Sequence, residues 1–263
     1  MLMLALGCAM NLAEMRSARV LEGGEWQLTQ VNSVVVPSAA VARSIDPARE
    51  LLGELGEDDE LSAQEREVVL GGLTAVALSS PGYGTYLDAA VGLGHGFDLS
   101  ARVGNGSYSV QARRSLLPPR KHPWHLSAGL RVGYSSGGAW LGVLDLANTA
   151  LSVSSLRRLD LSAHAAAGRD FGEWGKLWWG PRLQASPYRM QLDASRIGLD
   201  PQTSTGTLGW AGGFVGGGIG WRWVHFCGEL TVLGAWGRTQ AYGSEYSVSG
   251  VVLAPHWGVQ VTL

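Results

Sequence analysis

The chain has 263 residues, enough for one large β domain or two ordinary domains. Only 16% of its residues are charged and 46% are hydrophobic, whereas an average soluble domain is about 25% charged. Lysine occurs only at Lys121 and Lys176, and the net charge of −2 without a dense basic stripe argues against a nucleic-acid partner. Two cysteines make no disulfide framework, and no apolar run reaches the roughly 18 residues of a membrane-spanning helix.

The first ten residues, MLMLALGCAM, form a short apolar run that includes Cys8. The run predicts an export signal over residues 1–20, and its end resembles the lipobox of bacterial lipoproteins, in which the cysteine carries the lipid. Lipidation at Cys8 and an ordinary export signal with an incidental cysteine both stay open. Either interpretation sends the chain out of the cytoplasm.

Residues 25–36 predict a first strand, and a long connection follows it. Asp46 with Pro47 and the capping box of Ser62 with Glu65 predict two short helices within residues 46–72. This insertion is acidic, with nine acidic and two basic side chains in residues 46–67. A connection of this length is either a functional loop or a solvated segment without a partner.

From residue 83 onward, apolar and polar residues alternate with the period of a β-strand. In WHLSAGLRVGY, residues 124–134, one set runs from Trp124 through Leu130 to Tyr134, and the other contains His125 and Arg131. Tight turns such as NG at 105–106 predict an antiparallel meander. We expect twelve strands, or ten as the alternative, with residues 21–263 as one barrel domain. The expected strands start near residues 25, 83, 97, 107, 124, 139, 149, 157, 176, 208, 224 and 251, and the long connections 37–82, 190–206 and 238–250 lie at one rim.

Alternation alone does not say which set faces the interior. A lipocalin-type soluble barrel encloses the apolar set, whereas a transmembrane barrel turns it toward lipid. The polar set contains small residues and arginine but almost no lysine, which suits a confined lumen. Aromatic residues gather near strand ends, as membrane interfaces favour. Twelve strands of large apolar side chains also exceed what a barrel encloses, since about eight strands already fill theirs. We therefore predict a closed transmembrane up-and-down β-barrel.

At this point the chain resembles poorly characterised outer-membrane β-barrel proteins of bacteria. The resemblance rests on strand–turn–strand units such as YLDAAVGLGHGFDLSARVG and on the last strand, WGVQVTL, which alternates like the family's assembly signal but ends in Leu263. It implies a porin-like protein of the cell envelope, located in the outer membrane. Its partners would be outer-membrane lipid and the barrel assembly machinery, which reads the C-terminal strand. No motif specifies a substrate or an oligomeric state.

Charged side chains of the polar set are expected in the lumen. They either line an anion-attracting pore or form arginine–carboxylate ladders that brace a closed lumen, and we favour bracing because an unpaired buried charge is costly. The lumen residues are Asp88, Asp98, Arg102, Arg113, Arg131, Asp160, Arg182 and Glu229. The predicted aromatic girdle consists of Trp124, Tyr134, Trp179, Trp223, Trp236 and Trp257.

The predicted function is passive: a narrow pore or a structural barrel without catalysis, cofactor or metal. Asp160, Ser162 and His164 share one face of a strand and leave a lipid-modifying hydrolase as an alternative, although residues two apart are about 7 Å from one another. His225, Cys227 and Glu229 lie close in sequence but lack a fourth ligand, and we expect Glu229 to pair with a lumen arginine. A soluble ligand-binding barrel is the other alternative.

Overall fold

The computed structural model describes most of the chain. The described residues are 12–37, 62, 64, 65, 68, 82–117, 123–137, 152–194, 199–241 and 243–263. Ten strands make up the fold: β1 (Trp26–Pro37), β2 (Gly82–Gly94), β3 (Phe97–Gly104), β4 (Ser107–Ser115), β5 (Trp124–Gly137), β6 (Ser152–Phe171), β7 (Gly175–Ala194), β8 (Leu199–Trp221), β9 (Val224–Ala241) and β10 (Ser244–Thr262).

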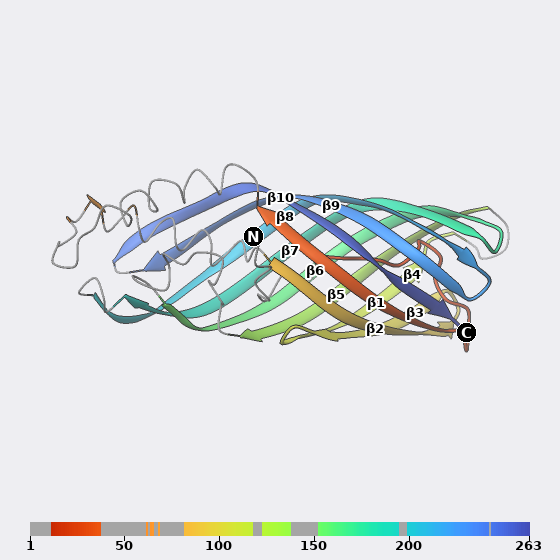
Figure 1. The fold of residues 1–263 in the computed structure, drawn as a ribbon, viewed down its shortest axis with the longest axis horizontal. Coiled ribbons are helices and arrows are strands. Elements are labelled where there is room, and N and C mark those ends of the chain that lie inside the picture. The colour runs from red at the N-terminus through yellow and green to blue at the C-terminus, as the bar shows by residue number, and fades with distance from the viewer. Residues whose placement is uncertain are drawn as a thin grey trace, which may run out of the picture.

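The ten strands close into one antiparallel barrel, in which each strand pairs with its neighbours in sequence and β1 pairs with β10 (Figure 1). Trp26 and Leu263 exchange backbone hydrogen bonds of 2.9 and 2.8 Å, which seal the seam at one end. Closure satisfies the backbone amides that would otherwise face hydrocarbon. The prediction of twelve strands was wrong and the alternative of ten is confirmed. The start expected at 157 falls inside one continuous strand, β6, which the structure describes from Ser152, and the starts expected at 139 and 149 lie outside the described residues.

Short turns connect β2 to β3 at the end of the barrel that holds Leu263 and β3 to β4 at the opposite end. His95 and Asn105 adopt φ values of 52° and 47°, and each is followed by a glycine that also has positive φ. Two consecutive residues with positive φ are what a two-residue hairpin turn of type I′ requires. The HG and NG signals in the sequence therefore mark real hairpins, β2–β3 and β3–β4.

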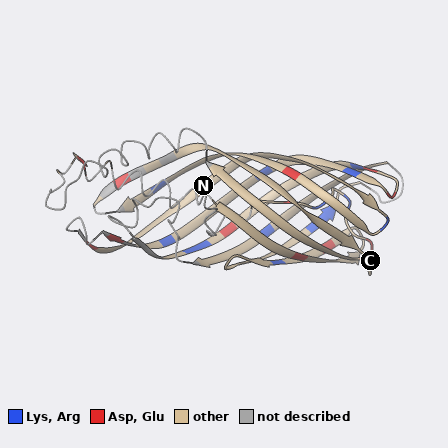
Figure 2. Cartoon of the chain, in the orientation of Figure 1, with Lys and Arg blue, Asp and Glu red and all other residues tan. Residues whose placement is uncertain are grey.

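The apolar set of each strand faces outward, and the polar set faces the lumen. In β5, Leu130 and Val132 are 67% and 53% exposed, whereas Arg131 between them is 5% exposed. The same alternation of exposed and buried residues runs through the described parts of all ten strands. Figure 2 shows how few charged residues interrupt the strands. A soluble barrel with an apolar core is excluded by this orientation.

The strands differ in length, and the barrel is taller on one side. β3 and β4 have 8 and 9 residues, whereas β6 to β10 have between 18 and 23. Beyond the last apolar positions, the outward faces of the long strands become polar. These outward polar residues include Arg157, Arg189, Thr203, Thr205, Thr207, Arg238 and Ser249. We call this part of β6–β10 the extended wall. Much of the predicted loops 190–206 and 238–250 is strand in this wall.

The predicted acidic loop lies mostly outside the described residues. Ser62 and Glu65 form the expected capping box, because the Ser62 amide donates to Glu65 Oε2 at 2.8 Å and the Glu65 amide donates to Ser62 Oγ at 3.3 Å. These interactions lower the pKa of the exposed Glu65 carboxyl. Gln64, Glu65 and Val68 are helical, but the described part of the chain contains no complete helix, and none in it is long and apolar enough to span a membrane.

Candidate functional site

The lumen of the barrel is occupied by the chain's own N-terminal segment, residues 12–21, which we call the lumen segment. All but one of its residues are buried, and Ala13, Met15 and Arg16 have no exposed surface. The segment leaves the barrel at a turn at Gly23–Gly24 and continues directly into β1 (Figure 1). The barrel interior is therefore a filled site in which ten strands surround an extended peptide.

Arginine side chains from the barrel wall bind the backbone carbonyls of the lumen segment. Each donor is a buried guanidinium on the inward face of its strand. The bonds are Arg182 to the Leu12 carbonyl at 2.6 Å, Arg102 to Ala13 at 2.6 Å, Arg131 to Ala13 at 3.1 Å, Arg102 to Glu14 at 3.1 Å, and Arg113 to Ser17 at 2.8 Å and to Arg19 at 3.1 Å. These contacts recognise backbone rather than side chains, and they hold successive residues of the segment in the centre of the lumen.

Glu229 on β9 binds the segment from its amide side. Its two carboxylate oxygens accept hydrogen bonds from the Glu14 and Met15 amides, each at 2.7 Å. Met15 has a φ of 50°, and this local bend lets two consecutive amides point at one carboxylate. Trp178 Nε1 donates a further bond of 2.9 Å to Glu229. The expected pairing of Glu229 with an arginine was wrong: backbone amides and an indole satisfy it.

The Glu14 carboxylate lies deep in the lumen and has partners on three strands. Gln111 donates to its Oε1 at 2.6 Å, Arg131 forms an ion pair with its Oε2 at 3.1 Å, and His164 Nε2 lies 3.4 Å from Oε1. A buried carboxylate is tolerated only when charge and hydrogen bonds compensate it. This network specifies the position of the segment along the barrel axis.

Asp98 fixes the segment near the end of the barrel that holds Leu263. Arg113 binds both oxygens of Asp98, at 3.1 and 2.7 Å, in the bidentate geometry that favours arginine. Arg16 and the Leu21 amide, both in the lumen segment, lie 3.0 and 3.1 Å from Asp98 Oδ2. The same carboxylate thus braces two neighbouring strands and holds the peptide.

The predicted lumen residues all point inward. Seven of them are at most 5% exposed, and Asp160 is half-buried. Two pairs lie on adjacent strands as bracing requires: Arg102 with Asp88 at 2.9 Å and Arg113 with Asp98. Arg131 and Arg182 have a different role, because their partners are the lumen segment and the glutamines beside them.

The predicted girdle residues are all exposed on the outer face, at 37–61%. Trp124 begins β5 and Trp223 lies in the β8–β9 turn, at the same end of the barrel as Trp26, Trp174 and Trp221. Tyr134 and Trp236 lie near the other edge of the apolar band. Trp257 is further from a strand end, level with Asn32 of β1, and its ring centroid lies 6.3 Å from that of Tyr83.

The alternative chemistries find little support in the lumen. Asp160 is hydrogen-bonded to Ser186 and Gln184, whereas His164 contacts Glu14 and Gln111, so Asp160 does not orient the imidazole. A serine–histidine–acid relay needs these groups within hydrogen-bond reach of one another. Within the described ranges, no three histidine, cysteine or acidic side chains are grouped to hold a metal ion.

Glycines in the lumen make room for large side chains. A Cβ on Gly216 would lie 2.5 Å from the Trp178 ring, and one on Gly129 would lie 2.4 Å from the His164 ring. The glycine-rich segment 209–221 is strand β8 and follows the interpretation that glycine accommodates a bulky neighbour. Trp178 is completely buried beside the lumen segment.

Sequence reasoning missed the lumen segment itself. Residues 12–20 fall within the predicted export signal 1–20, and the alternation of the strands does not indicate that a segment of the chain lies in the lumen. The signal present in the sequence is the pair of charged residues Glu14 and Arg16, which follow the apolar run and do not belong to the apolar region of an export signal.

The closed fold, the apolar outer band with its aromatic edges and the polar lumen together define a bacterial outer-membrane β-barrel protein. Solved structures that the chain is similar to belong to this class. Neisserial surface protein A is 12% identical over 91% of this chain and 97% of that chain, with a TM-score of 0.33. Ail, the attachment invasion locus protein of Yersinia pestis, is 9% identical over 92% of this chain and 100% of that chain, with a TM-score of 0.29. The Acinetobacter baumannii outer membrane protein Omp33 is 8% identical over 91% of this chain and 98% of that chain, with a TM-score of 0.25. No protein-family model and no curated protein matches the sequence.

Proposed function

We propose that this protein is a closed, structural outer-membrane barrel rather than an open pore. The observation that carries the proposal is the continuous set of hydrogen bonds from wall arginines to the carbonyls of residues 12–14. A solute that entered the lumen would have to displace this peptide and leave several buried charges without partners, which is costly. The lumen segment therefore serves as a built-in plug.

With the lumen closed, the surface available to other molecules is the outer end of the barrel. The extended wall of β6–β10 rises beyond the apolar band on one side, with polar and arginine side chains facing outward. Long connections of such barrels normally lie on the extracellular side. We infer that the barrel acts as a membrane-embedded scaffold that displays this wall outside the cell.

A gated pore is the second candidate, and one observation favours it. The lumen segment continues into β1 only at the Gly23–Gly24 turn, so it can leave the lumen without breaking a pair of strands. An emptied lumen would expose the four arginines that now bind the segment, and a basic constriction admits anions more readily than cations.

Conductance in planar bilayers distinguishes these functions. The pure, folded full-length chain is expected to give no steady channels, and frequent anion-selective openings in the unaltered protein would refute the closed barrel. The intact mass of the mature protein is the necessary companion measurement. We expect residues 12–21 to be retained, because removal of the predicted signal 1–20 would remove the plug and leave the lumen open.

A further inference from the structure

The outward face of β1 carries amide side chains in the middle of an apolar series. In order along the strand, the outward residues are Trp26, Leu28, Gln30, Asn32, Val34 and Val36. Gln30 is exposed and Asn32 is half-buried. Thr85 and Tyr83 of β2 lie beside Asn32 on the same outer face, and we call these four residues, Gln30, Asn32, Tyr83 and Thr85, the amide patch.

The positions of Gln30 and Asn32 along β1 place these two amides within the hydrocarbon of the membrane. β1 starts at Trp26, at the edge of the apolar band, and Gln30 and Asn32 follow four and six residues later. With a rise of about 3.3 Å per residue and a tilt of about 40°, the two amides lie about 10 and 15 Å above Trp26. The apolar band of such a barrel is about 25 Å tall, so both amides lie near its middle.

The hydrogen bonds within the patch leave one polar atom of each side-chain amide without a partner. Asn32 Oδ1 accepts from Tyr83 at 2.7 Å, from Thr85 at 3.2 Å and from Gln30 Nε2 at 3.4 Å. Among the residues that the structure describes, the side-chain atoms Gln30 Oε1 and Asn32 Nδ2 have no hydrogen-bond partner. Lipid tails supply neither donors nor acceptors, so these groups are costly when lipid surrounds them.

We propose that the amide patch is the centre of a homodimer interface, formed with a second copy of this chain. A second copy inserted in the same orientation carries the same amides at the same depth of the membrane. Each amide holds both a donor and an acceptor, so a two-fold axis along the membrane normal lets Gln30 and Asn32 satisfy their counterparts. Polar side chains stabilise association between membrane segments in this way.

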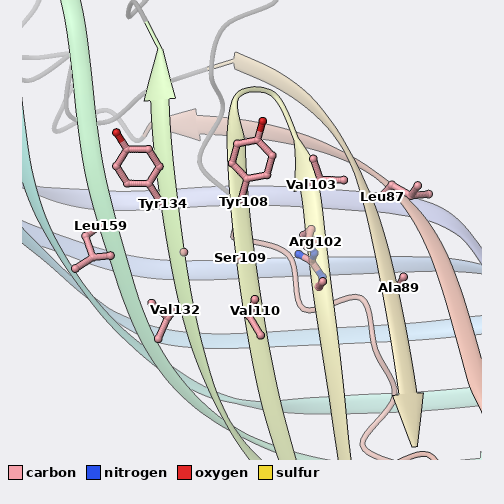
Figure 3. A pocket seen from close by; sticks show the side chains of 12 residues that line it. Leu87, Ala89, Arg102, Val103, Tyr108, Ser109, Val110, Val132, Tyr134 and Leu159 are labelled. Atoms are coloured by element: carbon pink, nitrogen blue, oxygen red, sulfur yellow. The ribbon is translucent and has the colours of Figure 1, made fainter.

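The surfaces that flank the patch are complementary under this symmetry. The strand order is β10–β1–β2, so the two-fold axis sets β10 of one copy opposite β2 of the other. β10 presents the large Trp257 level with Asn32. A shallow apolar groove of about 440 Å³ runs across β2 to β6 (Figure 3), and its β2 edge at Leu87 lies beside Gln30. At this edge Ala89 of β2 pairs with Ala101 of β3. An indole that faces the two alanines at the edge of this groove can pack closely against them.

Disulfide cross-linking in the outer membrane tests the proposal. Leu28 is 47% exposed, lies beside the patch and contributes no hydrogen bond to it, so Leu28→Cys reports contact without changing the amides. Leu183→Cys on β7, at a position 60% exposed, is the matched control, and the parent chain with its native cysteines gives the background. Under mild oxidation, Leu28→Cys is expected to yield a species of twice the chain mass, at least tenfold above Leu183→Cys.

The role of the amides is tested separately, by adding Gln30→Leu and Asn32→Leu to Leu28→Cys. Both leucines suit a lipid-facing strand, and a heat-shift gel verifies that the barrel folds. The cross-linked dimer is expected to fall at least tenfold. Equal cross-linking of Leu28→Cys and Leu183→Cys, a product at the mass of another protein, or a dimer that the leucines leave unchanged would each overturn the proposal. None of these outcomes depends on whether the lumen is open or closed.

Discussion

Replacement of Glu229 is expected to release the lumen segment while the barrel stays folded. The carboxylate accepts hydrogen bonds from the Glu14 and Met15 amides at 2.7 Å each, and both bonds are buried. A hydrogen bond to a charged group contributes about 1.5–3 kcal/mol. Because water enters the vacated site, we take the lower end for each bond, which gives about 3 kcal/mol for the pair in Glu229→Ala.

This loss shifts the equilibrium between the closed and open lumen. Since each 1.4 kcal/mol corresponds to about a factor of ten, the open fraction of Glu229→Ala should rise roughly 150-fold. Glu229→Gln keeps one carbonyl acceptor and should raise the open fraction about tenfold, through the loss of one bond of about 1.5 kcal/mol. The graded response distinguishes loss of these specific bonds from a general loosening of the barrel.

Single-channel recording in planar bilayers measures the open fraction directly. The matched control is Glu245→Gln, since Glu245 is a solvent-exposed carboxylate of β10 that lies 3.5 Å from Arg238 in the extended wall. It should leave the recordings as in the parent protein. If folded Glu229→Ala stays as silent as the parent, the carboxylate does not hold the segment, and the reasoning about the plug fails.

Three further predictions concern the wall and its contents. Leu130→Arg places a charge on an outward position that is 67% exposed near the middle of the apolar band, and it should destabilise the barrel by about 2–4 kcal/mol. Urea unfolding in lipid vesicles measures this loss of stability. The control is the rim variant Ser136→Arg, which should cost at most about 1 kcal/mol. Gly216→Ala brings a Cβ within 2.5 Å of the Trp178 ring and should lower the free energy of unfolding by about 1–3 kcal/mol. Gly228→Ala, whose Cβ would meet no atom closer than 4.0 Å, should leave it nearly unchanged. Similar urea midpoints for the two variants would contradict this packing. Hydrogen exchange should find the Glu14 and Met15 amides protected like those of the strands, since Glu229 binds both, and exchange as rapid as in an unstructured peptide would show that the segment does not reside in the lumen.

Particular strands show how far the sequence determines the fold. In β5 the alternation from Trp124 to Tyr134 is unbroken and predicts the strand, and its orientation follows only when the scarcity of lysine and the aromatic residues at strand ends are added. The HG and NG turns likewise give the first hairpins. The sequence predicts two strands where the structure has β6, since the outward residues change from polar to apolar between Arg157 and Leu159 and a polar outward residue resembles a turn when only the lipid face is considered. Strands that continue beyond the membrane cannot be distinguished from loops by hydrophobic period.

The site was predictable only in part for a related reason. The inward direction of Arg102, Arg113, Arg131 and Arg182 follows from the period of their strands. Their principal partners do not, because backbone carbonyls of residues 12–17 have no signature in the sequence. Glu229 illustrates the same limit, since its partners Glu14 and Met15 are more than 200 residues away in the chain.

The sequence by itself determined that this protein is a transmembrane barrel and which side of each strand meets lipid. It does so because neighbouring residues of a strand alternate between two environments, and the composition of the two sets, one apolar with aromatic residues at the strand ends and the other polar with almost no lysine, indicates which of them contacts lipid. Only the tertiary structure decided the number of strands, the height of the wall and the contents of the lumen. Those properties arise where distant segments converge, and the convergence of arginines on a peptide backbone depends on the closure of the whole barrel.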